Sequence, residues 1–155
     1  MLKLVLSVFF IISLASTPIK ANAQNIYKKA EIHCFDKDSV FYCETYSKKP
    51  ITGIVRDYSK YGLYSEEHYK DGHRDGVQKY YYPTGKISRE INYKNGIING
   101  IAKEYYESSG KLKIKADWSN FKQNGTVSLY DEDGTLTDKI KYINGRRKFQ
   151  PIRRR

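Results

Sequence analysis

Residues 93–112 read Tyr-Lys-Asn-Gly-Ile-Ile-Asn-Gly-Ile-Ala-Lys-Glu-Tyr-Tyr-Glu-Ser-Ser-Gly-Lys-Leu. The glycines of this stretch recur along the chain in three sets, each with a period of 23 to 25 residues, and the third set lacks one member at Asn120-Phe121. A fixed period of this length is typical of repeat proteins. The sets are Gly53, Gly76, Gly100 and Gly125; Gly62, Gly85, Gly110 and Gly134; and Gly72, Gly96 and Gly145.

Within each repeat, apolar and polar residues alternate, as they do at Leu112, Ile114, Ala116 and Trp118. This period of two predicts strands with one apolar face. Asx-Gly pairs bound these runs and favour hairpin turns. We therefore predict an all-β fold, an elongated antiparallel meander of stacked β-hairpins. The pairs read as turns are Asp71-Gly72, Asp75-Gly76, Asn95-Gly96, Asn99-Gly100, Asn124-Gly125, Asp133-Gly134 and Asn144-Gly145.

Aromatic residues fill two columns of the repeat, which we expect to lie side by side. Because aliphatic residues are scarce, the 15 tyrosines must supply much of the core. The third repeat carries Asn120-Phe121 where the others have Asx-Gly, so its turn is expected to be irregular. One column holds Tyr58, Tyr81, Tyr105 and Tyr130, and the other holds Tyr69, Tyr93, Trp118 and Tyr142.

Residues 93–100 and 100–112 resemble the MORN-variant repeat of bacterial proteins commonly labelled YwqK-family antitoxins. The resemblance extends over residues 47–149, most of the chain. It implies a fold of four stacked hairpin repeats. It also implies one concrete role, in which the protein neutralises a toxin by occluding it.

The N-terminal segment has the pattern of an export signal. A short positive start precedes an apolar run at residues 4–15, which is too short for a membrane span. We place the signal peptide at residues 1–23, with cleavage between Ala23 and Gln24; an uncleaved anchor is the alternative. The mature chain is then periplasmic or secreted.

Export changes the interpretation of the two cysteines. In an oxidising compartment, Cys34 and Cys43 are predicted to form a disulfide across a capping hairpin at residues 24–46. A metal site that includes His33 is the alternative, although two cysteines and one histidine fall short of a tetrahedral set. Four repeats (47–149) and a basic tail (150–155) complete the predicted organisation.

The formal net charge of +11 is concentrated at the C-terminus. Residues 146–155 carry six basic residues and no acidic residue, so the repeats themselves are close to neutral. Such a segment is either a solvated tail or a contact with an anionic envelope polymer or lipid. Nucleic acid is not expected as a partner of an exported protein. The candidate anion-binding residues are Arg146, Arg147, Lys148, Arg153, Arg154 and Arg155.

No catalytic, metal-binding or cofactor motif occurs in the sequence. Its mature histidines, His33, His68 and His73, do not recur with the repeat. We expect a non-catalytic module that binds a protein, with an envelope-associated surface module as the alternative and a homodimer as one way to cover an apolar face. The candidate contacts, of which Tyr80, Tyr82 and Tyr106 are expected to be the most exposed, are Tyr58, Tyr80, Tyr81, Tyr82, Tyr105, Tyr106, Trp118 and Tyr130.

Overall fold

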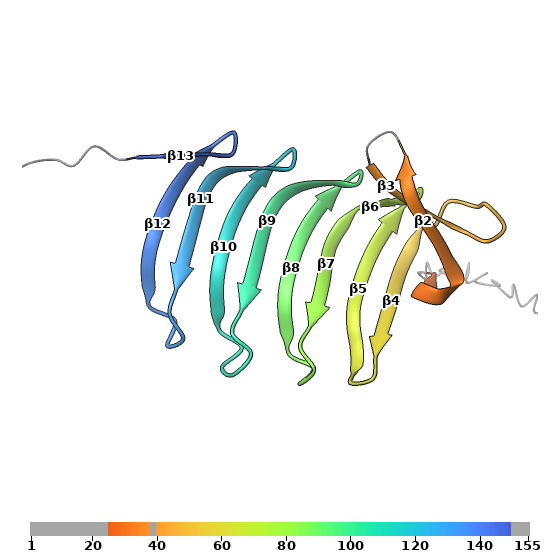
Figure 1. The fold of residues 1–155 in the computed structure, drawn as a ribbon, viewed down its shortest axis with the longest axis horizontal. Helices are drawn as coiled ribbons and strands as arrows, with labels where there is room; N and C mark the ends of the chain where they lie inside the picture. The colour runs from red at the N-terminus through yellow and green to blue at the C-terminus, as the bar shows by residue number, and fades with distance from the viewer. Residues whose placement is uncertain (1–24, 38–39, 150–155) are drawn as a thin grey trace, which may run out of the picture.

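The computed structural model describes residues 25–37 and 40–149, which form one sheet of 13 strands (Figure 1). The predicted signal peptide and Arg153, Arg154 and Arg155 lie outside these residues. In the described part, no helix is long and apolar enough to cross a membrane. The hairpin array comprises β4 (Gly53–Ser59), β5 (Gly62–Lys70), β6 (His73–Arg74), β7 (Gly76–Tyr81), β8 (Ile87–Lys94), β9 (Ile97–Tyr105), β10 (Leu112–Ser119), β11 (Lys122–Tyr130), β12 (Leu136–Ile143) and β13 (Arg146–Lys148).

The array is an antiparallel meander, so the predicted fold class is confirmed. Four long hairpins, β4–β5, β7–β8, β9–β10 and β11–β12, follow one another in chain order. The second strand of each hairpin pairs with the first strand of the next. Each repeat therefore adds two strands to one side of the sheet, and the array grows in one direction (Figure 1).

Three of the Asx-Gly pairs that we predicted as turns are bulges instead. Between the pairs Tyr93↔Ile98 and Ile91↔Ala102, β9 uses two more residues than β8, and Asn99-Gly100 lies in this excess. Asp75-Gly76 and Asn124-Gly125 occupy the same place in their repeats. A bulge and a turn both suit a residue at positive φ, so the dipeptide alone cannot separate them. The strands bend here before they run down the sheet (Figure 1).

Glycine is needed at these bulges for a second reason, which is close packing against the preceding strand. A Cβ atom on Gly125 would lie 2.6 Å from Asp117 Oδ2, and one on Gly100 would lie 3.1 Å from Asn92 Cβ. The side chains beneath the glycines bind the next repeat: Asn92 Nδ2 donates to the Ile101 carbonyl (2.7 Å), and Asp117 Oδ2 accepts from the Thr126 amide (2.9 Å). The glycine column thus makes room for a column of contacts between repeats.

The turn at Asn120-Phe121 is regular, contrary to expectation. Asn120 and Phe121 adopt φ of 49° and 63°, close to the values at Asn95 and Gly96. The Phe121 amide also donates to the Ile98 carbonyl (3.1 Å), as the turn glycines do to the preceding repeat. The surrounding pairing therefore holds a phenylalanine in a left-handed conformation that normally costs a non-glycine residue about 1–2 kcal/mol.

Replacing Phe121 with glycine is expected to stabilise the protein by about 1 kcal/mol, because the strain is removed at a partial cost in chain entropy. Phe121 is 48% exposed, so little packing is lost. Urea unfolding measures the change. Asn120→Gly is the control and should gain less, since asparagine tolerates positive φ. A lower unfolding free energy for Phe121→Gly would show that the ring makes a contact worth more than the strain.

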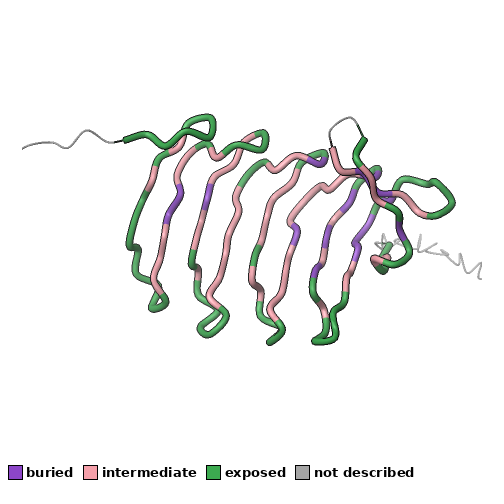
Figure 2. Tube along the Cα trace, viewed as in Figure 1, coloured by how far each residue is buried: buried purple, intermediate pink, exposed green. Residues whose placement is uncertain are grey.

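The N-terminal unit, residues 25–51, packs against one face of the first hairpin. It contains β1 (Ile26–Lys28), a 3₁₀ turn (Lys29–Glu31), β2 (Ile32–Lys37) and β3 (Val40–Thr45). Cys34 pairs directly with Cys43 and the predicted disulfide is present. A core forms from Ile32, Cys43 and Ile51 of this unit with Val55 and Tyr69 of the array. Figure 2 shows that most of the buried residues lie in this region, with shorter buried segments in β7, β10 and β11.

β2 and β3 also pack against the upper turns of the array, which are the turns drawn at the top of Figure 1, at Asp71-Gly72 and Asn95-Gly96. The Cys43 amide donates to the Gly72 carbonyl (2.7 Å). A Cβ on Gly72 would meet Tyr42 Cε2 at 2.1 Å, and one on Gly96 would meet Val40 Cγ1 at the same distance. The absence of a side chain at Gly72 and Gly96 therefore lets the β2–β3 hairpin pack against these two turns.

Candidate binding face

The two faces of the sheet differ in polarity. One row of directly opposed residues is apolar from β8 to β12 and consists of Ile91, Ala102, Ala116, Val127 and Ile140. We call the face that carries this row the open face. The residues beside it in sequence form the polar face, where Glu90 binds both Lys103 Nζ (3.4 Å) and the Tyr105 hydroxyl (2.7 Å).

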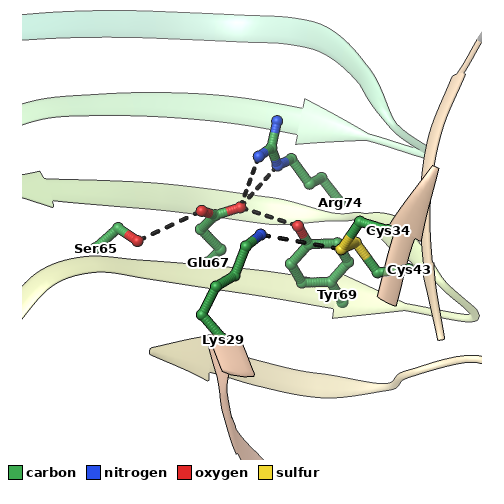
Figure 3. Close-up of a disulfide and its surroundings, with 7 residues drawn as sticks. All are labelled: Lys29, Cys34, Cys43, Ser65, Glu67, Tyr69 and Arg74. Atoms are coloured by element: carbon green, nitrogen blue, oxygen red, sulfur yellow. Dashed lines mark hydrogen bonds and ion pairs between the residues drawn. A yellow bond between two sulfur atoms is a disulfide. The ribbon is translucent and has the colours of Figure 1, made fainter. Parts of the chain in front are cut away.

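At β4 and β5 the open face is covered by the N-terminal unit and contains a buried ion pair (Figure 3). Glu67 Oε2 accepts from Arg74 Nε (2.8 Å), from Arg74 Nη2 (2.8 Å) and from the Tyr69 hydroxyl (2.9 Å). The Arg74 guanidinium also lies over the rings of Phe41 (5.1 Å) and Tyr93 (5.5 Å). Burial, together with the Glu67 charge, raises the pKa of Tyr69 above its usual range.

Beyond the turns at Gly72 and Gly96, against which the N-terminal unit packs, two adjoining hollows open on this face. The first has a volume of about 330 Å³ and is lined mainly by apolar side chains of β8 to β11. The second, of about 490 Å³, is more polar and contains Tyr64, Tyr80 and Tyr93. Both are bordered by the Arg89–Glu104 ion pair (3.1 Å). The apolar hollow is lined by Ile91, Ile98, Ala102, Ile114, Ala116 and Trp118.

The aromatic column of the repeat ends stands directly opposite the bulge glycines. Tyr93 pairs with Gly76, Trp118 with Gly100 and Tyr142 with Gly125. Because glycine has no side chain, this pairing leaves space for a large ring on the open face. Trp118 Nε1 is buried and has no hydrogen-bond partner among the described residues.

The second aromatic column lies on the polar face, so our expectation that the two columns lie side by side is wrong. Tyr105 contacts Glu90 there, and Tyr81 lies near Glu66 and Glu90 of the same face. Burial and the Glu90 hydrogen bond raise the pKa of Tyr105 to about 12. The strict alternation of strand side chains separates the columns, because the residues that carry them point to opposite sides.

The remaining predicted contact tyrosines have mixed positions. Tyr80 is on the open face, with its ring centroid 6.3 Å from that of Tyr64. Tyr82 and Tyr106 are half-buried, contrary to our expectation that they are among the most exposed, because their hydroxyls donate to the carbonyls of Tyr105 (2.7 Å) and Tyr130 (2.8 Å) in the next repeat. Tyr58 is 58% exposed at the first strand of the array, and Tyr130 is half-buried in β11.

Of the apolar residues that line the hollow, only Trp118 is among the contacts predicted from the sequence. Ile114 belongs to an alternating run of the sequence, but nothing in that pattern distinguishes it, Ile91 or Ile98 as a contact residue. The signal was nevertheless present, because the alternation is continuous over four repeats while only one segment, residues 24–46, is available to cover the resulting face. One short segment cannot cover the apolar face of four repeats, so the sequence indicates that part of this face is exposed.

The C-terminal end of the sheet is basic. A hollow of about 480 Å³ there is lined by Lys122, Ile143, Asn144, Arg146, Arg147 and Lys148. The last three form β13, whose residues are all exposed. Three of the six predicted anion-binding residues thus share one concave surface, and the other three lie outside the described residues.

The described residues form no group of three or more His, Cys, Asp or Glu side chains that could hold a metal ion. The pKa values of Tyr69, Tyr80, Tyr81 and Tyr105 are all raised, first by burial, and so move away from neutrality. Such tyrosines are poor general bases near pH 7. What the open face offers is shape, apolar area and aromatic rings.

Comparison with protein families supports the repeat. The MORN repeat variant matches residues 74–95 and 123–144. Comparison with the curated proteins and with the solved structures finds no match. The first matched segment contains the whole β7–β8 hairpin, and the second contains the β11–β12 hairpin except Lys122. Two of the four long hairpins in the described chain, β7–β8 and β11–β12, thus match the MORN repeat variant.

Proposed function

We propose that this protein is a non-catalytic, exported binding module that takes a protein partner on its open face. The observation that carries the proposal is the apolar hollow between β8 and β11. The N-terminal unit covers the same face at β4 and β5, so the sheet leaves only its later repeats uncovered. Contiguous apolar surface of this kind, bordered by polar residues, marks interaction sites in soluble proteins.

The residue types of the face fit a protein partner. Trp118 and Tyr80 provide large rings with polar atoms, and Arg89 is held in place by Glu104 beside the hollow. Trp, Tyr and Arg are the residues that most often dominate interface energies. The expected partner therefore presents an apolar segment to the hollow at Ile91 and Ile114, with polar groups toward Arg89.

The resemblance to antitoxin-labelled repeat proteins suggests one specific version of this role. In it, the open face covers an exported effector and blocks its action, as an immunity protein does. The predicted signal peptide and the Cys34–Cys43 disulfide favour a target met outside the cytoplasm, because disulfides persist in oxidising compartments.

Capture of envelope and secreted proteins by the mature chain tests the proposal, with Ile114→Lys as the variant. A lysine in the apolar hollow is expected to weaken the captured complex at least about tenfold, since a charge is buried without a partner. Ile101→Lys, on the polar face, is the matched control and should bind as the wild type does. Equal binding by both variants would place the partner elsewhere. Growth inhibition by the captured protein, relieved by the mature chain, would support the immunity version.

The basic hollow at β13 favours a second function, attachment to an anionic envelope polymer or lipid. The same capture experiment separates the two functions. The second function predicts that replacing Arg146, Arg147 and Lys148 with glutamine abolishes retention of the protein in the envelope. It also predicts that the Ile114→Lys variant is still retained. Unchanged retention after these replacements would remove its support.

A further inference from the structure

The first and last long strands of the hairpin array, β4 and β12, have outer edges that are only half covered. β1 pairs with residues 54–56 of β4, and β13 pairs with residues 141–143 of β12. On these edges, residues 57–59 and 136–140 pair with no other strand in the described chain. Unpaired backbone groups on a strand edge are a template for strands of other molecules.

Two backbone amides point outward from these uncovered halves. Ile54 donates across the outer edge of β4 to the Asn25 carbonyl (2.8 Å), and alternate residues of a strand point to the same edge, so the Tyr58 amide points outward too. In β12, the two-residue turn Asn144-Gly145 makes Ile143 and Arg146 the hydrogen-bonded pair that closes the β12–β13 hairpin, so the Ile143 amide points toward β13. By the same alternation, the Lys139 amide points to the uncovered edge.

Both outward amides are occupied by an aspartate side chain. Asp57 Oδ1 accepts from the Tyr58 amide at 2.9 Å, and Asp138 Oδ1 accepts from the Lys139 amide at 2.7 Å. In each case the carboxylate belongs to the residue just before the amide and folds back over the edge. An added strand would have to displace the carboxylate and place its own carbonyl beside a negative charge.

The repeat shows that these aspartates are not required by the fold of a hairpin. Asp57 lies four residues after Gly53, and interior strands carry Tyr80, Glu104 and Leu129 at that position. Asp138 lies four residues after Gly134, and the equivalent residues are Glu66, Arg89 and Ile114. Among the eight long strands of the array, aspartate occurs at these positions only in β4 and β12, the two whose outer edge is partly open.

We propose that Asp57 and Asp138 close the two ends of the hairpin array against strands of a second copy of this chain. β4 runs in the same direction as β11, so β4 of one molecule can continue the antiparallel order after β12 of another. Such a contact joins unlike ends and does not close on itself, so it leads to filaments. The inference concerns edges and not the open face, so it stands or falls independently of the proposed function.

Sedimentation velocity of the mature chain over a range of concentrations tests the proposal. The double variant Asp57→Ala/Asp138→Ala is expected to form species that grow with concentration, with an association constant at least about tenfold above that of the wild type. Each single variant has one open end and should resemble the wild type. An equimolar mixture of the two single variants should form a one-to-one pair and no larger species.

Two further double variants separate the effect of the hydrogen bond to the edge amide from the effect of the negative charge. Asp57→Asn/Asp138→Asn keeps an oxygen that accepts the amide proton and should sediment as the wild type does. Asp36→Ala/Glu107→Ala removes two exposed carboxylates that accept no hydrogen bond from the described residues, and it should also be unchanged. Association of either variant to the level of the alanine pair would show that charge alone is responsible and would overturn the proposal.

The folded state is checked by circular dichroism before sedimentation. If Asp138→Ala does not fold, Asp138→Ile replaces it, because β10 carries isoleucine at the same position. A folded double variant that sediments as the wild type does would overturn the proposal, as would a one-to-one mixture of single variants that shows no pairing.

Discussion

Replacing Arg74 with alanine is expected to lower the free energy of unfolding by about 3–5 kcal/mol. Its partner Glu67 has a side chain only 7% exposed, so the substitution leaves a buried carboxylate without its counter-charge. The guanidinium also fills the space between Phe41 and Tyr93, and those ring contacts are lost with it. Urea unfolding measures the loss, and release of the N-terminal unit should accompany it as increased amide exchange at Cys43.

A surface pair of the same sheet provides the control. Arg89 and Glu104 are 52% and 39% exposed, and Arg89→Ala should cost less than about 1 kcal/mol. The double variant Arg74→Ala/Glu67→Gln should recover part of the stability, because the unpaired charge is gone. Equal costs for Arg74→Ala and Arg89→Ala would show that the buried pair contributes no more than a solvated one.

Replacing Gly72 with alanine is expected to cost about 3–5 kcal/mol, mainly because the Tyr42 ring must leave its site. The new Cβ would lie 2.1 Å from Tyr42 Cε2, and Tyr42 is 7% exposed between the rings of Phe35 and His73. The backbone strain at φ of 83° adds about 1–2 kcal/mol.

Replacing Gly85 with alanine separates the cost of backbone strain from the cost of the clash with Tyr42. It has φ of 80°, and a Cβ there would meet nothing within 4 Å. Gly85→Ala should therefore lower the free energy of unfolding by the backbone strain alone. The difference between the two variants measures the contribution of the contact between Tyr42 of β3 and the turn at Gly72. In the Tyr42→Ala background, Gly72→Ala should cost no more than Gly85→Ala, since the ring is absent. Similar costs for the two glycines in the wild type would mean that Tyr42 moves aside without loss.

The hairpin array could be predicted from the sequence because its signals repeat. A single Asx-Gly pair can be a turn or a bulge, but four repeats with the same alternation are compatible only with a hairpin array. The errors occurred where two structures need the same backbone conformation, as at Asn99-Gly100. The spacing held a clue, because Asn95-Gly96 and Asn99-Gly100 are too close together for both to end a long strand.

The position of the N-terminal unit could not be predicted in the same way. Cys34 and Cys43 indicated a hairpin, but nothing in residues 25–51 has the period of the repeat. Its place depends on single contacts, such as Tyr42 against Gly72 and Arg74 between Phe41 and Tyr93. The candidate site depends on that position, because the N-terminal unit decides which part of the open face stays uncovered.

The bonds between hairpins have a consequence for how the gene can change. Beyond the hairpins that contact the N-terminal unit, each hairpin is bonded to its neighbours through columns such as Tyr82 and Tyr106 or Asn92 and Asp117. Duplication or deletion of 24 or 25 codons would therefore join matching columns and leave the disulfide-bonded beginning and the basic end unchanged. Each such event would alter the length of the sheet by about 10 Å, the width of two strands. The sheet can thus be lengthened or shortened in whole-hairpin steps that preserve the contacts between hairpins.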